Sequence, residues 1–315
     1  MARVSAYRIA VVGAGGVGGY FGGKLAAGGV DTTFVVRGKT LDALRARGLR
    51  VSSIDGDFSV GAVNATDRPS EAVDAVLMTV KAWQLREAAA HIKPIVRDDT
   101  IVVPLENGID AAEELLAVLP KRNVAAGLCA IVSFVVEPGV IRHAGGSPFI
   151  MFGELDNRAT ARAERLRDAL RSAGIKADIS DDIQKSLWSK FVFIAPMSGV
   201  GASTRVPVGV WRTVPETRRL AERAMEELIA VARARGVGFD DDTISKTMHR
   251  YDALPPDATS SLQRDVMSGR PSELDAQLGA AVRLGRESNV PVPVLETLYD
   301  LLLPQELVSR GEQNR

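Results

Sequence analysis

The stretch Arg8-Ile-Ala-Val-Val-Gly13-Ala-Gly-Gly-Val-Gly18 decides the fold, because an apolar run breaks there into closely spaced glycines and continues as a helix-like pattern. It predicts a strand, a tight turn and a helix. In a Gly-x-Gly-x-x-Gly turn the first glycine makes the bend, the second lets a pyrophosphate approach the backbone, and the third allows close helix–strand packing. The helix then directs free N–H groups at the phosphates. We therefore expect a dinucleotide to contact Gly13, Ala14, Gly15, Gly16, Val17 and Gly18.

The alternative for this turn is a glycine-rich bend that binds nothing. A second apolar run at residues 32–36 favours the dinucleotide site, and its end selects the cofactor. Sites for NAD usually end this strand with an acid that accepts from the ribose 2′-hydroxyl, whereas here Arg37 follows, and Asp31 stands at the wrong end. A cation suits a 2′-phosphate, so we expect NADP, as NADPH, with Arg37 as a ligand. A solvated loop cation is the alternative for Arg37.

Composition narrows the function classes. The 315 residues suffice for two domains, and 39 Lys and Arg balance 39 Asp and Glu. The chain therefore has no net charge that would attract nucleic acid or a membrane surface. One cysteine and three scattered histidines predict neither a disulfide nor a metal site, and no apolar stretch reaches the roughly 18 residues that span a bilayer. We expect a soluble cytoplasmic protein whose partner is a small molecule.

Strand-like and helix-like runs alternate in the first half of the chain, whereas helical patterns alone follow residue 181. This predicts an α/β fold, with a Rossmann-type domain over residues 1–182 and an all-α domain over 183–315. The strands are expected at residues 8–12, 32–36, 49–53, 58–63, 75–80, 100–106, 124–136, 149–152 and near 179, with turns at 137–139 and 143–146. The helices are expected at residues 40–47, 111–119, 160–173, 216–235, 241–250, 259–267, 272–288 and 294–303 and in the run that follows Leu187.

Two polar side chains follow strands of the expected sheet. Lys81 comes after residues 75–80, and Asn107 comes after residues 100–106. The carboxyl ends of parallel strands face the crevice where open α/β sheets bind ligands. Lys81 is therefore a candidate for a cofactor phosphate, and Asn107 for the nicotinamide or a substrate carbonyl. The alternatives are a surface lysine and an ordinary Asn-Gly turn.

In the second half, Lys190, Ile194 and Ser198 are spaced four residues apart and share one face of an apolar helix. A lysine on such a face is a candidate proton donor, although its stem can also simply cover the core. Near Glu273 the pattern of Pro, Ser and acids is explained by helix capping alone.

Taken together, five segments resemble the ketopantoate reductase (2-dehydropantoate 2-reductase) family, in order from about residue 7 to about residue 303. They are Gly13–Gly18, Val80-Lys81-Ala-Trp-Gln84, Glu106-Asn107-Gly108, Leu187-Trp188-Ser-Lys190, and Ser260-Ser261 with Asp265, Arg270 and Glu273-Leu-Asp275. The resemblance implies a Rossmann domain and a helical domain with NADPH and substrate in the cleft between them.

The same resemblance implies residue roles. Lys190 matches the general acid that protonates the carbonyl oxygen as hydride reaches C2, and Glu273 matches a glutamate beside the cofactor and that lysine. Ser261 matches the serine that holds the substrate carboxylate, while Asn107 matches the asparagine that contacts nicotinamide and substrate. Arg37 and Lys81 match cations near the adenosine phosphate.

The chain departs from the family where asparagines are expected, since Ile194, Ser198, Ala258 and Leu278 stand there. An apolar side chain cannot bond the hydroxyl of 2-dehydropantoate, which is the first expected substrate. Ser198 is kept as a candidate substrate ligand. A different, less polar 2-oxo acid or hydroxy acid is the second hypothesis, and an NADP-binding sensor without turnover is the third. The sequence leaves the oligomeric state open, with a homodimer as the candidate.

Overall fold

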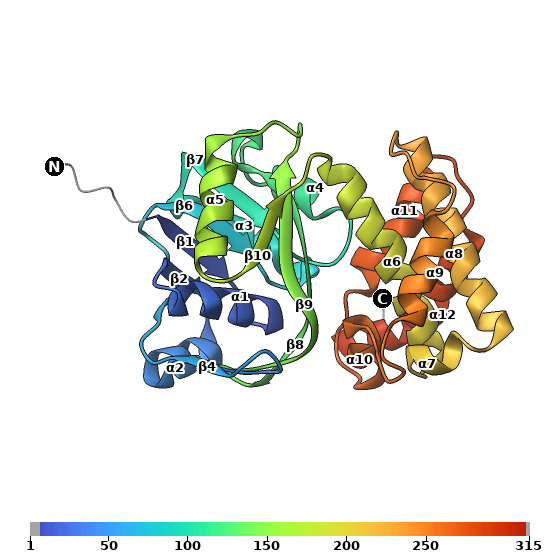
Figure 1. Cartoon of the computed structure of the whole chain (residues 1–315), viewed down its shortest axis with the longest axis horizontal. Coiled ribbons are helices and arrows are strands. Elements are labelled where there is room, and N and C mark those ends of the chain that lie inside the picture. Colours follow the sequence, from blue (N-terminus) through green and yellow to red (C-terminus); the bar gives the residue numbers. More distant parts are fainter. Residues whose placement is uncertain (1–6, 313–315) are drawn as a thin grey trace. The chain divides into compact units, whose positions relative to one another are not determined.

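The computed structural model describes residues 7–312, which divide into two compact units. The first comprises the chain up to Glu106 together with Ala111–Ile183, and the second comprises Asn107–Asp110 and the chain from Gln184 onward. The first unit combines sheets and helices, whereas the second is helical (Figure 1). This confirms the predicted fold class.

A five-stranded parallel sheet organises the first unit in the order β5-β2-β1-β6-β7. The strands are β1 (Arg8–Val12), β2 (Asp31–Val35), β5 (Asn64–Thr66), β6 (Val73–Met78) and β7 (Val96–Pro104). The central strands β1 and β6 are almost wholly buried, as expected where helices or a second sheet cover both faces. Strand order reverses between β1 and β6, which is where Rossmann sheets bind their ligands.

Five helices accompany this sheet: α1 (Gly16–Ala27), α2 (Gly38–Arg47), α3 (Leu85–His91), α4 (Ala111–Leu116) and α5 (Ala161–Ser172). Helix α1 packs both on β1 and β2 and on strands of a second sheet. That sheet has the order β10-β9-β3-β4, with β8 pairing on β9. Its strands are β3 (Leu49–Ser53), β4 (Phe58–Val60), β8 (Ala125–Glu137), β9 (Val140–Glu154) and β10 (Lys176–Ile179). Strands β3 and β4 pair antiparallel and form a hairpin across residues 55–57.

The predicted turn at residues 143–146 is wrong, because these residues belong to β9. His143 pairs with Ser133 of β8 on one side and with Ser53 of β3 on the other. Gly146 has a φ of +78° where the β8–β9 register shifts, so the glycines form a bulge and not a chain reversal. The predicted strand at 58–63 is also shorter, since β4 ends at Val60.

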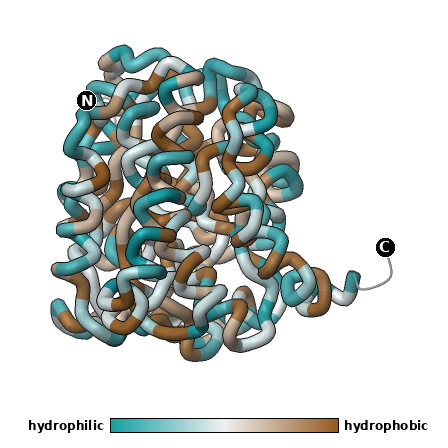
Figure 2. The backbone as a smooth tube through the Cα atoms, turned by 90° about the vertical axis from the view of Figure 1, so that its right-hand side faces the viewer, coloured by the Kyte–Doolittle hydropathy of each residue, from teal (hydrophilic) through white to brown (hydrophobic). Residues whose placement is uncertain are grey.

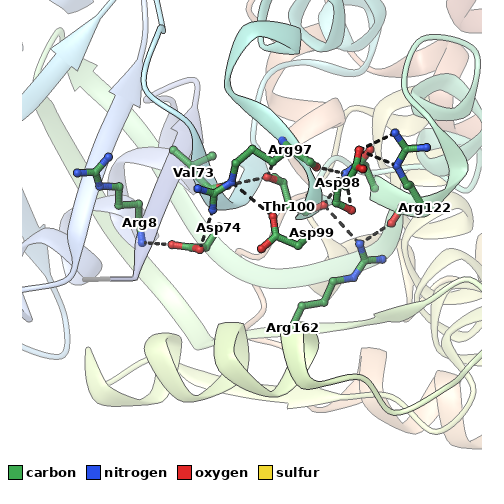
Figure 3. A network of polar contacts seen from close by, with 10 residues as sticks. Arg8, Val73, Asp74, Arg97, Asp98, Asp99, Thr100, Arg122 and Arg162 are labelled. Carbon is green, nitrogen blue, oxygen red and sulfur yellow. Dashed lines mark hydrogen bonds and ion pairs between the residues drawn. The ribbon is translucent and has the colours of Figure 1, made fainter. Parts of the chain in front are cut away.

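A network of polar contacts links strands β1, β6 and β7 of the first sheet (Figure 3). The Arg8 backbone N–H donates to the Asp74 carboxylate at 2.8 Å, and Arg97 reaches the same carboxylate at 3.1 Å. The buried Thr100 hydroxyl donates to the Val73 carbonyl at 2.6 Å. Arg162 of α5 then donates to the Thr100 carbonyl at 3.4 Å, so one network ties strands and helix together.

In the described part of the second unit, seven α-helices pack around an apolar core. They are α6 (Ile183–Thr204), α7 (Val208–Trp211), α8 (Pro215–Ala234), α9 (Thr243–Asp252), α10 (Ser261–Met267), α11 (Ala280–Glu287) and α12 (Pro293–Arg310). Apolar and hydrophilic residues alternate along these coils, as amphipathic helices require (Figure 2). A π-helical turn, Asp275–Gly279, leads into α11.

Helix α12 runs beyond the predicted end at Leu303, through Pro304 to Arg310. Proline removes a donor, but the buried Glu306 holds the following turn by accepting from the Ser272 backbone N–H at 3.0 Å and from its hydroxyl at 2.6 Å. Arg310 donates to Glu306 at 2.6 Å. The short helix α7 was not predicted.

The buried pair Glu154–Arg162 gives a pH-dependent test of the first unit. Arg162 donates to both Glu154 oxygens, at 2.7 and 2.6 Å, and the Thr160 hydroxyl donates at 2.7 Å. Burial raises the pKa of Glu154, but these bonds outweigh it and leave the pKa below the ordinary value of 4.5. The pair therefore stabilises the fold above that value, and its contribution is lost as the pH falls through the lowered pKa.

We expect Glu154→Gln to lower the free energy of unfolding by about 1–3 kcal/mol at neutral pH, because a charged acceptor of Arg162 is lost. The difference between wild type and variant should shrink in acid, where the wild-type carboxylate is protonated. Urea unfolding at both pH values measures this, and a difference that is equal at both would contradict it.

Candidate active site

The glycine turn after β1 is held from both neighbouring strands. The Gly13 N–H donates to the Val35 carbonyl of β2 at 3.0 Å, and Gly13 has a φ of +95°. Beyond β6, the Thr79 hydroxyl lies 2.8 Å from the Val12 carbonyl oxygen and 3.0 Å from that of Gly13. This buried hydroxyl therefore fixes the bend from the side of β6.

The glycines of the turn differ in how much space surrounds each of them, and this difference indicates different roles. A Cβ on Gly18 would lie 2.2 Å from the Gly13 carbonyl oxygen and from the Thr79 hydroxyl, so no side chain fits. A Cβ on Gly15 would meet nothing within 4 Å. The turn is thus tightly packed at its third glycine and open at its second, where α1 begins without a side-chain cap on its first N–H groups. This geometry fits a dinucleotide pyrophosphate.

The candidate cations of the first unit lie close to their strand ends. Arg37 is exposed two residues beyond β2, and its guanidinium pairs with Glu87 of α3 at 2.7 Å. Asp31 begins β2 and pairs with Arg8 at 3.3 Å, so it lies at the opposite end of the strand from Arg37. Lys81 is half-buried beyond β6, with its ammonium 5.7 Å from the centre of the Trp83 ring.

In the second unit, α6 carries Lys190, Ile194 and Ser198 on one face. Lys190 is half-buried, and its ammonium makes no hydrogen bond or ion pair with any residue between 7 and 312. Ser198 is fully buried, and its hydroxyl has no partner in that described range. Neither polar group is thus engaged by another described residue.

The structure brings Asn107 and Glu273 together although they lie far apart in the sequence. The Asn107 amide donates to the Glu273 carboxylate at 3.3 Å, and Glu273 is only 6% exposed. Gly108 has a φ of +129°, and a Cβ there would lie 2.7 Å from the Ala276 carbonyl oxygen. Arg283 adds a bond to Asp110 at 3.3 Å. Residues 107–110 are thus closely packed on the segment that carries Glu273.

The residues near α10 have separate tasks. The Ser260 hydroxyl accepts from the Gln263 N–H at 3.0 Å and caps α10, whereas Ser261 is half-buried and is not needed for the cap. Ala258 is half-buried in the preceding loop, where its carbonyl accepts from Val208 at 3.0 Å. The Ser261 hydroxyl thus remains a candidate ligand.

Sequence reasoning missed two polar residues. Thr79 fixes the glycine turn, and its only signal was a hydroxyl within an apolar strand. Gln277 is a fully buried amide in the π-helical turn. In the described part of the chain, no helix is long and apolar enough to cross a membrane, and no three His, Cys, Asp or Glu side chains group to hold a metal ion.

Both units match models of one protein family. Residues 9–157 match the family model described as ketopantoate reductase PanE/ApbA, and residues 182–306 match the model of its C-terminal part. An uncharacterized oxidoreductase, YkpB, of Bacillus subtilis (strain 168) is 32% identical over 92% of this chain and 95% of its own length. The 2-dehydropantoate 2-reductase of Mesorhizobium japonicum is 30% identical over 94% of this chain and 96% of its own.

Among solved structures, the crystal structure of 2-dehydropantoate 2-reductase from Geobacter metallireducens GS-15 is similar, with a TM-score of 0.88 and 31% identity. The match covers 94% of this chain and 99% of that one. The likeness therefore extends over both units.

The contrast between Gly18 and Gly15 can be tested. We expect Gly18→Ala to lower the melting temperature by several degrees, because its Cβ collides with backbone as well as with Thr79. Gly15→Ala should leave the melting temperature within about a degree or two of wild type but weaken NADPH binding by about tenfold or more, since its methyl projects where a pyrophosphate would lie. Scanning calorimetry and fluorescence titration measure both, and equal melting losses would contradict the assignment.

Proposed function

The chain belongs to the ketopantoate reductase family, whose members are oxidoreductases acting on a CH–OH group, and on that premise we propose that it reduces a 2-oxo acid to the 2-hydroxy acid with NADPH. The first substrate to test is 2-dehydropantoate. The observation that carries the proposal is the hydrogen bond between Asn107 and the buried Glu273. An ordinary Asn-Gly turn would not require this bond at Asn107, and helix capping would not require it at Glu273.

The first unit fits the cofactor. The glycine turn would hold the pyrophosphate with N–H groups at the start of α1, because Gly15 leaves its approach open. Arg37 and Lys81 would contact the adenosine phosphate, and the acid Asp31 stands at the other end of β2, away from the ribose site. When bound, NADPH supplies hydride to C2 of the substrate.

Lys190 is proposed as the proton donor. As hydride reaches C2, negative charge develops on the carbonyl oxygen, and a proton must arrive there to complete the alcohol. An ammonium placed at that oxygen stabilises the charged transition state more than the neutral ketone. Lys190 is half-buried, and its ammonium has no carboxylate partner within residues 7–312, so it is free to donate.

The neighbouring groups are proposed to orient the reactants. Glu273 and Asn107 hold each other in place, and the second N–H of the Asn107 amide can donate to the nicotinamide or the substrate carbonyl. The half-buried Ser261 hydroxyl would bind the substrate carboxylate.

A less polar 2-oxo acid is the second candidate substrate, and Ile194 favours it. Ile194 is half-buried one turn after Lys190 and cannot bond a hydroxyl, and Leu278 is buried in the core. The grouping of Asn107 with Glu273 speaks against a non-catalytic NADP sensor, which needs no such site in the second unit. We also retain 1–182 and 183–315 as the two domains, with residues 107–110 contributing to the packing of the second.

The deciding measurement is NADPH oxidation with 2-dehydropantoate and a panel of 2-oxo acids. We expect Lys190→Ala to lower kcat by about a hundredfold or more while NADPH still binds, because the proton donor is lost. Lys185→Ala, on the same helix but exposed, is the matched control and should keep wild-type turnover. Full activity of the Lys190 variant would end the assignment.

Cofactor preference tests the pair Arg37–Glu87. We expect Arg37→Ala to reduce the preference for NADPH over NADH by about tenfold or more, because a charged bond to the 2′-phosphate is lost. Glu87→Gln should raise that preference by about two- to five-fold, since its carboxylate competes for Arg37 and repels the phosphate. Dissociation constants for both cofactors measure this. A preference that neither substitution alters would place the phosphate contact elsewhere.

A further inference from the structure

Gln277 is a polar side chain whose burial the fold alone does not explain. It lies in the π-helical turn Asp275–Gly279 and is 0% exposed, and neither its amide nitrogen nor its amide oxygen has a partner among the described residues. A buried amide left unpaired at both atoms destabilises a protein, and native proteins contain few. Single π-helical turns are frequent at functional sites. Together these features mark Gln277 as a group that meets a ligand.

Gln277 lies on the same helix face as Glu273, a residue of the candidate active site. The Gln277 N–H donates to the Glu273 carbonyl at 3.1 Å, so Gln277 follows Glu273 by one helical turn and shares its face. The Glu273 carboxylate accepts from Asn107 at 3.3 Å. One face therefore carries the carboxylate proposed for the reaction and, one turn later, an unpaired amide.

Leu278, where the family resemblance predicts an asparagine, faces elsewhere. A Cβ on Gly199 of α6 would lie 3.2 and 3.3 Å from the two Leu278 methyl groups and 3.1 Å from a methyl of Leu298. Position 278 is thus part of the apolar packing between α6 and α12. The side-chain amide in this segment belongs to the preceding residue, Gln277, which lies within the wider turn of a π-helix.

The opposite helix offers a second unpaired group. Ser198 directly precedes Gly199, just as Gln277 directly precedes Leu278, and Gly199 and Leu278 pack against each other. The Ser198 hydroxyl is fully buried and has no partner within residues 7–312. It lies on the face of α6 that carries Lys190. The Ser198 hydroxyl and the Gln277 amide, neither of which has a partner among the described residues, thus directly precede the two residues of this packing contact.

We propose that Gln277, assisted by Ser198, binds a hydroxyl group of the substrate and selects a hydroxylated 2-oxo acid over the same acid without its hydroxyl. This inference rests on the proposed function. The Gln277 amide can accept from that hydroxyl through its oxygen and donate to it through its nitrogen. This replaces the bonds that Ile194 and Leu278 cannot make. A site built to bond a hydroxyl discriminates strongly against an analogue that lacks it, because its own polar groups then stay unpaired.

The test compares 2-dehydropantoate with 3,3-dimethyl-2-oxobutanoate, which is the same acid without the hydroxyl. Wild type should favour the hydroxylated acid, and Gln277→Leu should lower the ratio of kcat/KM values by about tenfold or more. Turnover of the acid without the hydroxyl should be unchanged or higher. The melting temperature should not fall, since an unpaired amide is replaced by an apolar group. Ser198→Ala should shift the ratio in the same direction by a smaller factor.

Ser203→Ala is the matched control, because the Ser203 hydroxyl on α6 also has no partner among residues 7–312 but lies five residues beyond Ser198, on a different face. It should leave the ratio unchanged. Gln277→Met serves the same purpose as the leucine variant if the latter does not fold. An unchanged ratio, an equal loss for both acids, or a wild type that prefers the acid without the hydroxyl would overturn the inference while the reductase assignment stands.

Calorimetry of pantoate and of 2-hydroxy-3,3-dimethylbutanoate, each with NADP⁺ present, separates this inference from the reaction itself. Selective loss of pantoate binding in Gln277→Leu supports it, and equal binding of both acids by wild type and variant overturns it. A wild type that oxidises NADPH with none of the 2-oxo acids overturns the proposed function instead.

Discussion

The close approach of α1 to the end of β1 is the constraint on which the first unit depends. At Gly18 the helix backbone lies so near the Gly13 carbonyl and the Thr79 hydroxyl that no side chain fits, and Thr79 in turn ties the bend to β6. On its other side α1 packs against the second sheet, where a Cβ on Gly16 would collide with the Ser133 carbonyl of β8. The helix start is therefore fixed by packing before any ligand arrives, and its one open position, Gly15, is where a phosphate can approach.

The second unit depends on a similar close approach, made by a short segment. Residues 107–110 follow the end of β7 in the chain, yet they pack with the helical unit. The positive φ of Gly108 permits this contact, because a Cβ there would strike the Ala276 carbonyl. Arg283 binds both Asp110 and Asp275, at 3.3 and 2.8 Å, and thereby holds the segment on the π-helical turn. The bond between Asn107 and Glu273 is a consequence of that packing.

Local patterns revealed most of the fold, because each of the parallel strands β1 and β6 is a continuous apolar run and each long helix has an apolar face. Local patterns failed where residues that are distant in the sequence determine the local structure. The glycines after His143 indicate a turn in isolation, but β3 and β8 hold them in a strand. The proline at 304 indicates a helix end, but Glu306 bonds to Ser272 beyond it. In the site, residue types pointed to Lys190 and Glu273, whereas no local pattern encodes a bond across 166 positions or an unpaired Gln277. The assigned roles stay predictions until they are measured.

Reaction class and substrate choice depend on different parts of this structure. In the reaction that we propose, hydride and proton transfer use the glycine turn and the Lys190 ammonium, which belong to a closely packed backbone turn and to one face of α6. Substrate choice rests on single polar groups, each worth about 1–3 kcal/mol, which one substitution can move or remove. An apolar residue would make the core more stable at Gln277 and at Ser198, because each now buries polar atoms without partners among the described residues. Membership of the family therefore fixes the class of reaction more firmly than the acid on which the protein acts, and we propose that the unpaired groups distinguish that acid.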